Sequence, residues 1–96
     1  MDKIFKALAD TNRRKILTLL KKKDMSVNEI LKYFQIGQAT VSSHLAILRK
    51  SNLVSVRKAE RLRIYSLNKE VFDKFVLEIN KFAEMAVLSD EIIMRR

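Results

Sequence analysis

The chain has 96 residues, 48% of them hydrophobic, which is enough to build one compact core without a metal or a disulfide. Its 20 Lys and Arg against 11 Asp and Glu give a formal charge of +9, which favours a polyanionic partner, although a basic chain can owe its charge to solubility alone. The lack of Cys excludes a disulfide framework and a thiolate metal site. Neither a secretory signal nor an apolar run of about 18 residues is visible, so we expect one soluble, cytoplasmic domain over residues 1–96 that does not insert into a membrane.

Two short helices are predicted at the start of the chain. In residues 2–9 the apolar side chains fall on one side of a helix: Ile4, Phe5, Leu8 and Ala9. Asp10 can cap a second helix, from Thr11 to about Lys22, whose core positions are Ile16, Leu17, Leu19 and Leu20. Three cations in its first turns either reach phosphates or form a solvated face: Arg13, Arg14 and Lys15.

A third helix is predicted after Ser26, because Ser26 and Glu29, three residues later, form a capping-box pattern. We expect this helix to end within residues 33–35, and Gly37, the only glycine, to supply the turn before a fourth helix over residues 38–50. Two short helices joined by a tight turn are typical of a helix-turn-helix.

The fourth helix has an unusual outer surface. Val41, Leu45 and Leu48 form one apolar stripe that would pack on a core. The opposite side is small and mostly uncharged, in a chain that is 32% charged, and consists of Ala39, Thr40, Ser43, Ala46 and Lys50, bordered by Gln38, Ser42 and His44. Short polar side chains permit close approach, and the DNA major groove, about 12 Å wide, admits such a helix. The plainer interpretation is an amphipathic helix whose polar side chains happen to be short.

A β-hairpin is predicted after Asn52, where the apolar period changes from 3.6 to about 2. Its turn carries four cations with Glu60 as the single acid among them: Arg57, Lys58, Arg61 and Arg63. Beside the fourth helix, these cations would hold a phosphate backbone. The alternative is a solvated sheet edge that charge protects from aggregation.

From Lys69 the helical period returns for more than four turns, and the apolar stripe is wider than one core contact requires. We expect this helix and the first one to pack against a second copy of the chain. The expected interface residues are Ile4, Phe5, Leu8, Phe72, Phe75, Ile79, Phe82 and Ala86. The alternative is that the last helix covers the core of its own subunit. Residues 89–96 either add a turn capped by Ser89 or fray.

The order of elements resembles the ArsR-type winged helix-turn-helix repressors over residues 4–82, and within them the small SdpR-type repressors. The resemblance rests on residues 5–11, 13–17 with Leu20, 39–48, 53–54 and 65–67. It implies a mainly α fold with a small β-hairpin, in the order α-α-α-α-β-β-α, and a homodimeric transcriptional repressor whose fourth helix enters the major groove.

The chain departs from the family pattern at two places. Ser51-Asn52 stands where Ala-Gly is frequent, which is a mild change because Asn tolerates the left-handed conformation. The wing has Lys58-Ala59-Glu60 and no Gly, so we expect a different turn.

The resemblance does not extend to the family's metal sites, which use Cys on the third helix or His with carboxylates on the last one. Here the last helix offers only carboxylates, which alone make a poor transition-metal site: Asp73, Glu78 and Glu84. We therefore expect no inducer metal and no cofactor. His44, the only histidine, has no nucleophile with an orienting acid, so we expect no enzyme. Its ring either packs at the helix border or contacts DNA.

The leading interpretation is sequence-specific binding of double-stranded DNA by a homodimer, with two recognition helices about 34 Å apart over an inverted repeat. The expected DNA-binding residues are Gln38, Thr40, Ser42, Ser43, His44, Arg57, Lys58, Arg61 and Arg63. One alternative is a winged-helix protein-interaction module whose last helix binds a regulatory protein partner. The other is a non-specific architectural or RNA-binding protein that uses the charge without reading bases.

Overall fold

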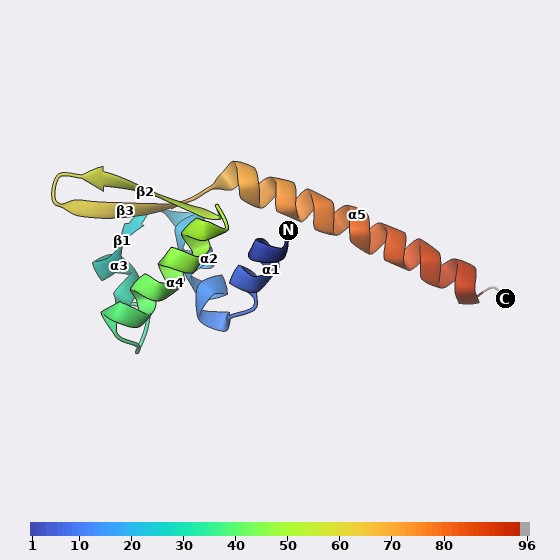
Figure 1. The fold of residues 1–96 in the computed structure, drawn as a ribbon, viewed down its shortest axis with the longest axis horizontal. Coiled ribbons are helices and arrows are strands. Elements are labelled where there is room, and N and C mark those ends of the chain that lie inside the picture. The colour runs from blue at the N-terminus through green and yellow to red at the C-terminus, as the bar shows by residue number, and fades with distance from the viewer. Residues whose placement is uncertain (95–96) are drawn as a thin grey trace.

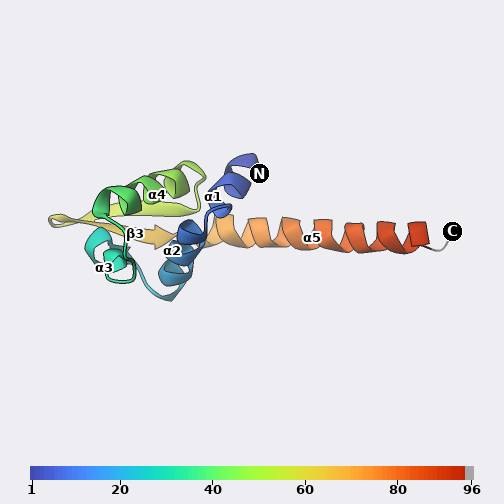
Figure 2. The same ribbon diagram turned by 90° about the horizontal axis from the view of Figure 1, so that it is seen from below.

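The computed structural model describes residues 1–94, which form a small helical body, a three-stranded sheet and one long helix (Figure 1). The long helix, α5 (Lys69–Met94), leaves the body and projects away from it, so the molecule is 62 Å long but only 26 and 21 Å across. Figures 1 and 2 both show α5 running alone beyond its first turns. The predicted mainly helical order with a hairpin is confirmed.

The first two helices are α1 (Asp2–Leu8) and α2 (Thr11–Lys22). Asp10 caps α2 as predicted, because one of its carboxylate oxygens accepts hydrogen bonds from the backbone N–H groups of Asn12 at 2.8 Å and Arg13 at 3.1 Å. The four core positions predicted on α2 are all buried. The cap and the apolar stripe together explain where this helix begins and which face it buries.

The prediction of which apolar side chains of α1 are buried was partly wrong. Ala7 is the fully buried residue of this helix, whereas Phe5 is 50% exposed and Ala9, which follows the helix end, is also exposed. Ile4 and Leu8 are half-buried and pack against the core. The helix is only seven residues long and lies close against the body, so its smallest side chain takes the innermost position.

The segment after α2 contains a strand that the sequence did not predict. β1 (Met25–Ser26) pairs with the hairpin and leads directly into α3 (Val27–Leu31). The predicted capping box is present, since the Ser26 side chain accepts from the Glu29 backbone and the Glu29 carboxylate accepts from the Ser26 N–H. The helix ends at Leu31, earlier than predicted, and single-turn bonds carry the chain onward to Phe34.

The fourth helix, α4 (Gln38–Lys50), has the predicted bounds. Gly37 precedes it with φ −76° and ψ 164°, an extended conformation that any residue adopts, so the turn does not depend on glycine. Just past the other end of the helix, Asn52 has φ 62°. The N–H of Asn52 donates to the Arg49 carbonyl, and the N–H of Leu53 donates to the Leu48 carbonyl. These two bonds form a Schellman motif, with Asn in the position that glycine usually takes.

The sheet has the strand order β1-β3-β2, with β2 (Val54–Ala59) and β3 (Leu62–Leu67) forming the predicted hairpin. Both pairings are antiparallel, and Ala59 faces Leu62, which leaves a two-residue turn. Within that turn Glu60 has φ 55°, in the left-handed region where glycine is usual. The wing without glycine therefore places a non-glycine residue in a costly conformation.

One core lies between the helices and the inner end of the sheet. Its buried apolar residues are Ala7, Ile16, Leu17, Leu19, Leu20, Met25, Ile30, Val41, Leu45, Leu48, Leu53, Val54 and Tyr65. All lie before α5 in the chain, and Val71 and Phe72 in the first turn of α5 are only partly buried against the core. The body is thus complete without most of the long helix.

Candidate nucleic-acid interface

The candidate recognition surface is the outward face of α4. Val41, Leu45 and Leu48 are fully buried, so this stripe fixes which side of the helix turns inward. The polar positions on the other side are exposed as predicted: Gln38, Thr40, Ser42 and Ser43, together with Ala39 and Ala46. A fully buried stripe beneath a short-chained polar face is the arrangement that lets a helix approach base edges closely.

His44 lies at the inner border of this surface rather than on it. Its side chain is only 12% exposed, its Nδ1 lies 3.3 Å from the Arg13 guanidinium, and its Nε2 lies 4.0 Å from the Asp10 carboxylate. The backbone N–H of Arg13, above all, holds the pKa of the Asp10 carboxyl below its usual value. The geometry therefore supports the packed role of the ring among the two roles that the sequence left open.

The cations in the first turns of α2 are used inside the molecule, which the sequence did not predict. Arg13 donates to the carbonyls of Lys6 and Ala7, and Arg14 donates to the Leu8 carbonyl at 2.6 Å. Lys15 donates to the Tyr33 carbonyl, just after α3, and its Nζ lies 4.5 Å from the Phe34 ring centre. A run of cations after a helix cap carries no signal that separates carbonyl binding from phosphate binding.

The wing cations are all exposed, but they are not equivalent. Arg57 is paired with Asp24 at 2.8 Å and also donates to the Ser66 hydroxyl at 3.1 Å. Its hydrogen bond is the main reason that the pKa of Asp24 lies below the usual value. The other three, Lys58, Arg61 and Arg63, lie at or beside the tip on an exposed stretch of the hairpin.

The residues predicted for the dimer interface divide into three groups. Ile4, Leu8 and Phe72 pack against the subunit's own core. Phe5 and Phe75 meet edge to face, with ring centres 5.6 Å apart. Farther along α5, Ile79 is half-buried, whereas Phe82 and Ala86 are exposed. Three further large apolar residues on α5 are exposed: Val76, Leu77 and Met85.

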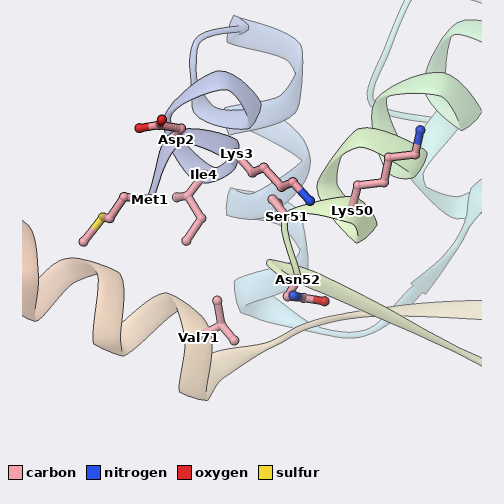
Figure 3. Close-up of a pocket in the computed structure, with 8 residues that line it drawn as sticks. All are labelled: Met1, Asp2, Lys3, Ile4, Lys50, Ser51, Asn52 and Val71. Carbon is pink, nitrogen blue, oxygen red and sulfur yellow. The ribbon is translucent and has the colours of Figure 1, made fainter.

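An open cavity of about 600 Å³ lies where α1, the end of α4 and the start of α5 meet. Figure 3 shows the Lys3 side chain of α1 reaching toward Ser51, with Ile4 on the side of Val71, while Lys50 points outward. Among residues 1–86, whose side chains the structure describes, no three metal-ligating side chains cluster. Over residues 1–94, no helix combines the length and the apolar character that a membrane span requires.

The chain matches a known family and solved structures. Residues 10–56 match the model described as bacterial regulatory protein, arsR family. The chain is 41% identical over 71 residues to the transcriptional repressor SdpR of Bacillus subtilis, covering 74% of this chain and 79% of that protein. It is 34% identical over 77 residues to the arsenical resistance operon repressor of Staphylococcus aureus, covering 80% and 74%.

Two solved structures have the same fold. The crystal structure of an ArsR family transcriptional regulator superposes with a TM-score of 0.78 at 28% identity, covering 88% of this chain and 92% of that one. HlyU from Vibrio cholerae superposes with a TM-score of 0.68 at 32% identity, covering 84% and 89%. These proteins are regulators, in agreement with the expectation that the chain is not an enzyme. The chain belongs to the arsR family of bacterial regulatory proteins and is a winged helix-turn-helix DNA-binding regulator of transcription.

Proposed function

We propose that the protein is a sequence-specific repressor that acts in the cytoplasm and binds an inverted repeat in double-stranded DNA as a homodimer. The observation that carries this proposal is the exposed, short-chained polar face of α4 above a fully buried apolar stripe. The names of the SdpR and arsenical resistance relatives support repression. We propose further that no metal is the inducer, because α5 offers carboxylates as metal ligands but has neither His nor Cys.

Base readout is assigned to α4. Gln38, Thr40, Ser42 and Ser43 are exposed on one helix, and their amide and hydroxyl groups both donate and accept hydrogen bonds. Gln bonds adenine in the major groove, and Ser and Thr bond several base edges or phosphates. His44 is left out of this set, since its ring faces Arg13 and Asp10.

Backbone binding is assigned to the wing. Lys58, Arg61 and Arg63 extend from the hairpin tip, and a net charge of +9 supplies the long-range attraction to a phosphate backbone. Phosphate contacts of this kind set register and orientation without reading sequence. The division of labour therefore gives specificity to α4 and salt-dependent affinity to the wing.

Dimerisation is assigned to α1 and α5. The two helices already meet at Phe5 and Phe75, and beyond that contact α5 projects from the body with Phe82 69% and Met85 66% exposed. Exposed large apolar side chains on a helix that lies away from its own core are stabilised by burial against another chain. A second copy satisfies this in both subunits at once and brings two α4 helices to one duplex.

The proposal is tested by titrating the purified protein with its own upstream DNA and with an unrelated duplex across a salt series. We expect a preference of about a thousandfold that persists at physiological salt. Thr40→Ala and Ser43→Ala should reduce that preference, whereas the matched control Thr18→Ala, exposed on α2, should not. Equal and steeply salt-dependent binding to both duplexes would instead identify a non-specific binder.

The dimer is tested separately by sedimentation equilibrium. The wild-type protein should have the mass of two chains, and Phe82→Glu should shift it to one. Leu62→Glu is the matched control, because Leu62 is 51% exposed but lies on the wing. A wild-type protein that sediments as a monomer would contradict the homodimer and leave the α5 surface to a protein partner.

A further inference from the structure

One side chain connects three helices near the recognition surface. Arg13, in the first turn of α2, donates through Nε to the Ala7 carbonyl at 2.7 Å and through Nη2 to the Lys6 carbonyl at 3.0 Å. Its Nη1 lies 3.3 Å from Nδ1 of His44 in α4. The guanidinium thus contacts the end of α1 and the middle of α4 at the same time.

The acceptors fit a guanidinium. The carbonyls at the end of α1 have few partners within the helix, and they lie at the negative end of its dipole. An arginine has five N–H donors in a planar fork, so it can bond two backbone carbonyls and still direct a third donor elsewhere. A lysine at this position would carry the same charge but would lack that fixed geometry.

The same contact, taken as a hydrogen bond, selects one tautomer of the histidine ring. Because a guanidinium can only donate, His44 Nδ1 must accept and Nε2 must carry the ring hydrogen. That hydrogen-bearing nitrogen faces the Asp10 carboxylate at 4.0 Å, and the same carboxylate caps α2. The other charged side chain in the first turn of α2, Arg14, is turned to Leu8 and Thr11. The ring is therefore held between one cation and one anion.

We propose that Arg13 is a positioning residue for DNA recognition, which locks the rotation of α4 to the end of α1 through His44. This inference rests on the proposed role of α4. In the described part of the chain, the side chains of α4 make no other hydrogen bond to α1 or α2. Apart from the contact of His44 with Asp10, the inner face of α4 packs through its apolar stripe, which has no direction of its own. His44 is adjacent to Ser43 and one turn beyond Thr40, so fixing its ring fixes the direction in which both residues point.

The link also connects the recognition helix α4 to the proposed dimer interface within one subunit. Its other end is the α1 backbone, and α1 packs on α5 through Phe5 and Phe75. A shift of α1 at the dimer interface would therefore be transmitted to α4 by a short polar path. Removing the link should weaken base discrimination more than it weakens attraction to the phosphate backbone.

The test uses Arg13→Lys and Arg13→Gln in the full chain, with binding to upstream and unrelated DNA measured across salt concentrations. Both variants should lose about tenfold or more of the preference for upstream DNA, which corresponds to about 1.4 kcal/mol. Arg13→Lys should keep the wild-type salt slope. If Arg13→Lys behaves as the wild type while Arg13→Gln lowers the slope by about one per subunit, Arg13 is a phosphate contact and the proposal is wrong.

A second pair of variants keeps the test informative if Arg13 variants fold poorly, as judged by circular dichroism. His44→Asn places an amide oxygen near the position of Nδ1 and should retain more of the preference than His44→Leu, which offers no acceptor. Equal behaviour of the two variants would overturn the proposal. Loss of preference in His44→Leu with no loss in Arg13→Lys would also overturn it, because His44 would then act on DNA directly.

Thr40→Ala separates this inference from the proposed function on which it rests. If Thr40→Ala and Ser43→Ala leave the preference unchanged, α4 does not read DNA and both proposals fail. If those two substitutions reduce the preference while Arg13→Lys does not, only the positioning role fails.

Discussion

The guanidinium of Arg57 lies 2.8 Å from a carboxylate oxygen of Asp24, and this ion pair ties the outer strand of the wing to the segment between α2 and β1. The strand order explains how Arg57 on β2 reaches Asp24. Its side chain passes over β3, the strand between β2 and β1, where it also donates to the Ser66 hydroxyl. The ion pair thus spans the sheet from one edge to the other. The ion pair sets the direction of the wing. It also engages Arg57, one of the four wing cations that the sequence pattern assigns to DNA binding.

The wing cations should therefore contribute unequally to the salt dependence of DNA binding. Replacing Lys58, Arg61 or Arg63 with Ala should lower the slope of log affinity against log salt by about one per subunit for each phosphate that is no longer neutralised. Arg57→Ala should leave the slope nearly unchanged and reduce affinity by loosening the wing. The measurement is a fluorescence anisotropy titration at several salt concentrations. A reduction of the slope in Arg57→Ala equal to that in Arg63→Ala would contradict this distinction.

Acid should destabilise the protein through its bonded carboxylates. Hydrogen bonds from Arg57 to Asp24, from the Ser26 backbone to Glu29 and from the Arg13 backbone to Asp10 hold all three pKa values below their usual range in the folded state. Each contribution is complete above the pKa of the unfolded chain, near 4, and is lost as the pH falls through the lower folded pKa.

The melting temperature should therefore be steady near neutral pH and fall between about pH 5 and pH 3. Asp24→Asn should have a lower melting temperature at pH 7 and a shallower fall below pH 5, because its side chain takes up no proton. Arg57→Ala should show the same flattening, since the hydrogen bond of Arg57 is the main cause of the lowered pKa of Asp24. Thermal denaturation followed by circular dichroism gives both quantities. An unchanged acid limb in both variants would contradict the assignment.

Glu60 offers a separate test of the wing turn. Its φ of 55° is unfavourable for a residue with a Cβ, so Glu60→Gly should raise the free energy of unfolding by about 0.5–1 kcal/mol. The substitution also removes the one acid at a basic tip, which should strengthen DNA binding at low salt. Glu60→Gln separates the two effects, because it should strengthen binding without a gain in stability. A gain in stability in Glu60→Gln would show that charge, not backbone conformation, is responsible.

Local signals in the sequence were sufficient for much of the fold. Caps such as Asp10 and Ser26 are read from neighbouring residues, and the stripe on α4 is read from spacing, so both were predicted correctly. The strand β1 was missed because it has only two residues and exists by pairing with Tyr65 and Ile64 far along the chain. The burial of Ala7 in place of Phe5 also depends on how closely α1 lies against the body, which no period encodes.

The candidate site could likewise be predicted only in part. The exposed face of α4 follows from the position of its buried stripe, and the exposure of the wing tip follows from the hairpin. The partners of Arg13 and Arg57 cannot be predicted from local pattern, because His44 lies 31 positions from Arg13 and Asp24 lies 33 positions from Arg57. A cation in a sequence shows its charge but not whether that charge is directed to a carbonyl, a carboxylate or a phosphate.

The orientation of α4 on the core can be tested with two residues of that helix. Leu45 is fully buried, so Leu45→Ala should lower the free energy of unfolding by about 2–5 kcal/mol, a large part of the stability of a domain this size. Ile47, two positions on, is 39% exposed, and Ile47→Ala should lower it by less than about 1 kcal/mol. Urea denaturation measures both values. Comparable decreases at the two positions would mean that α4 is rotated from the orientation described, and the polar face that includes Thr40 and Ser43 would then not be available to read DNA.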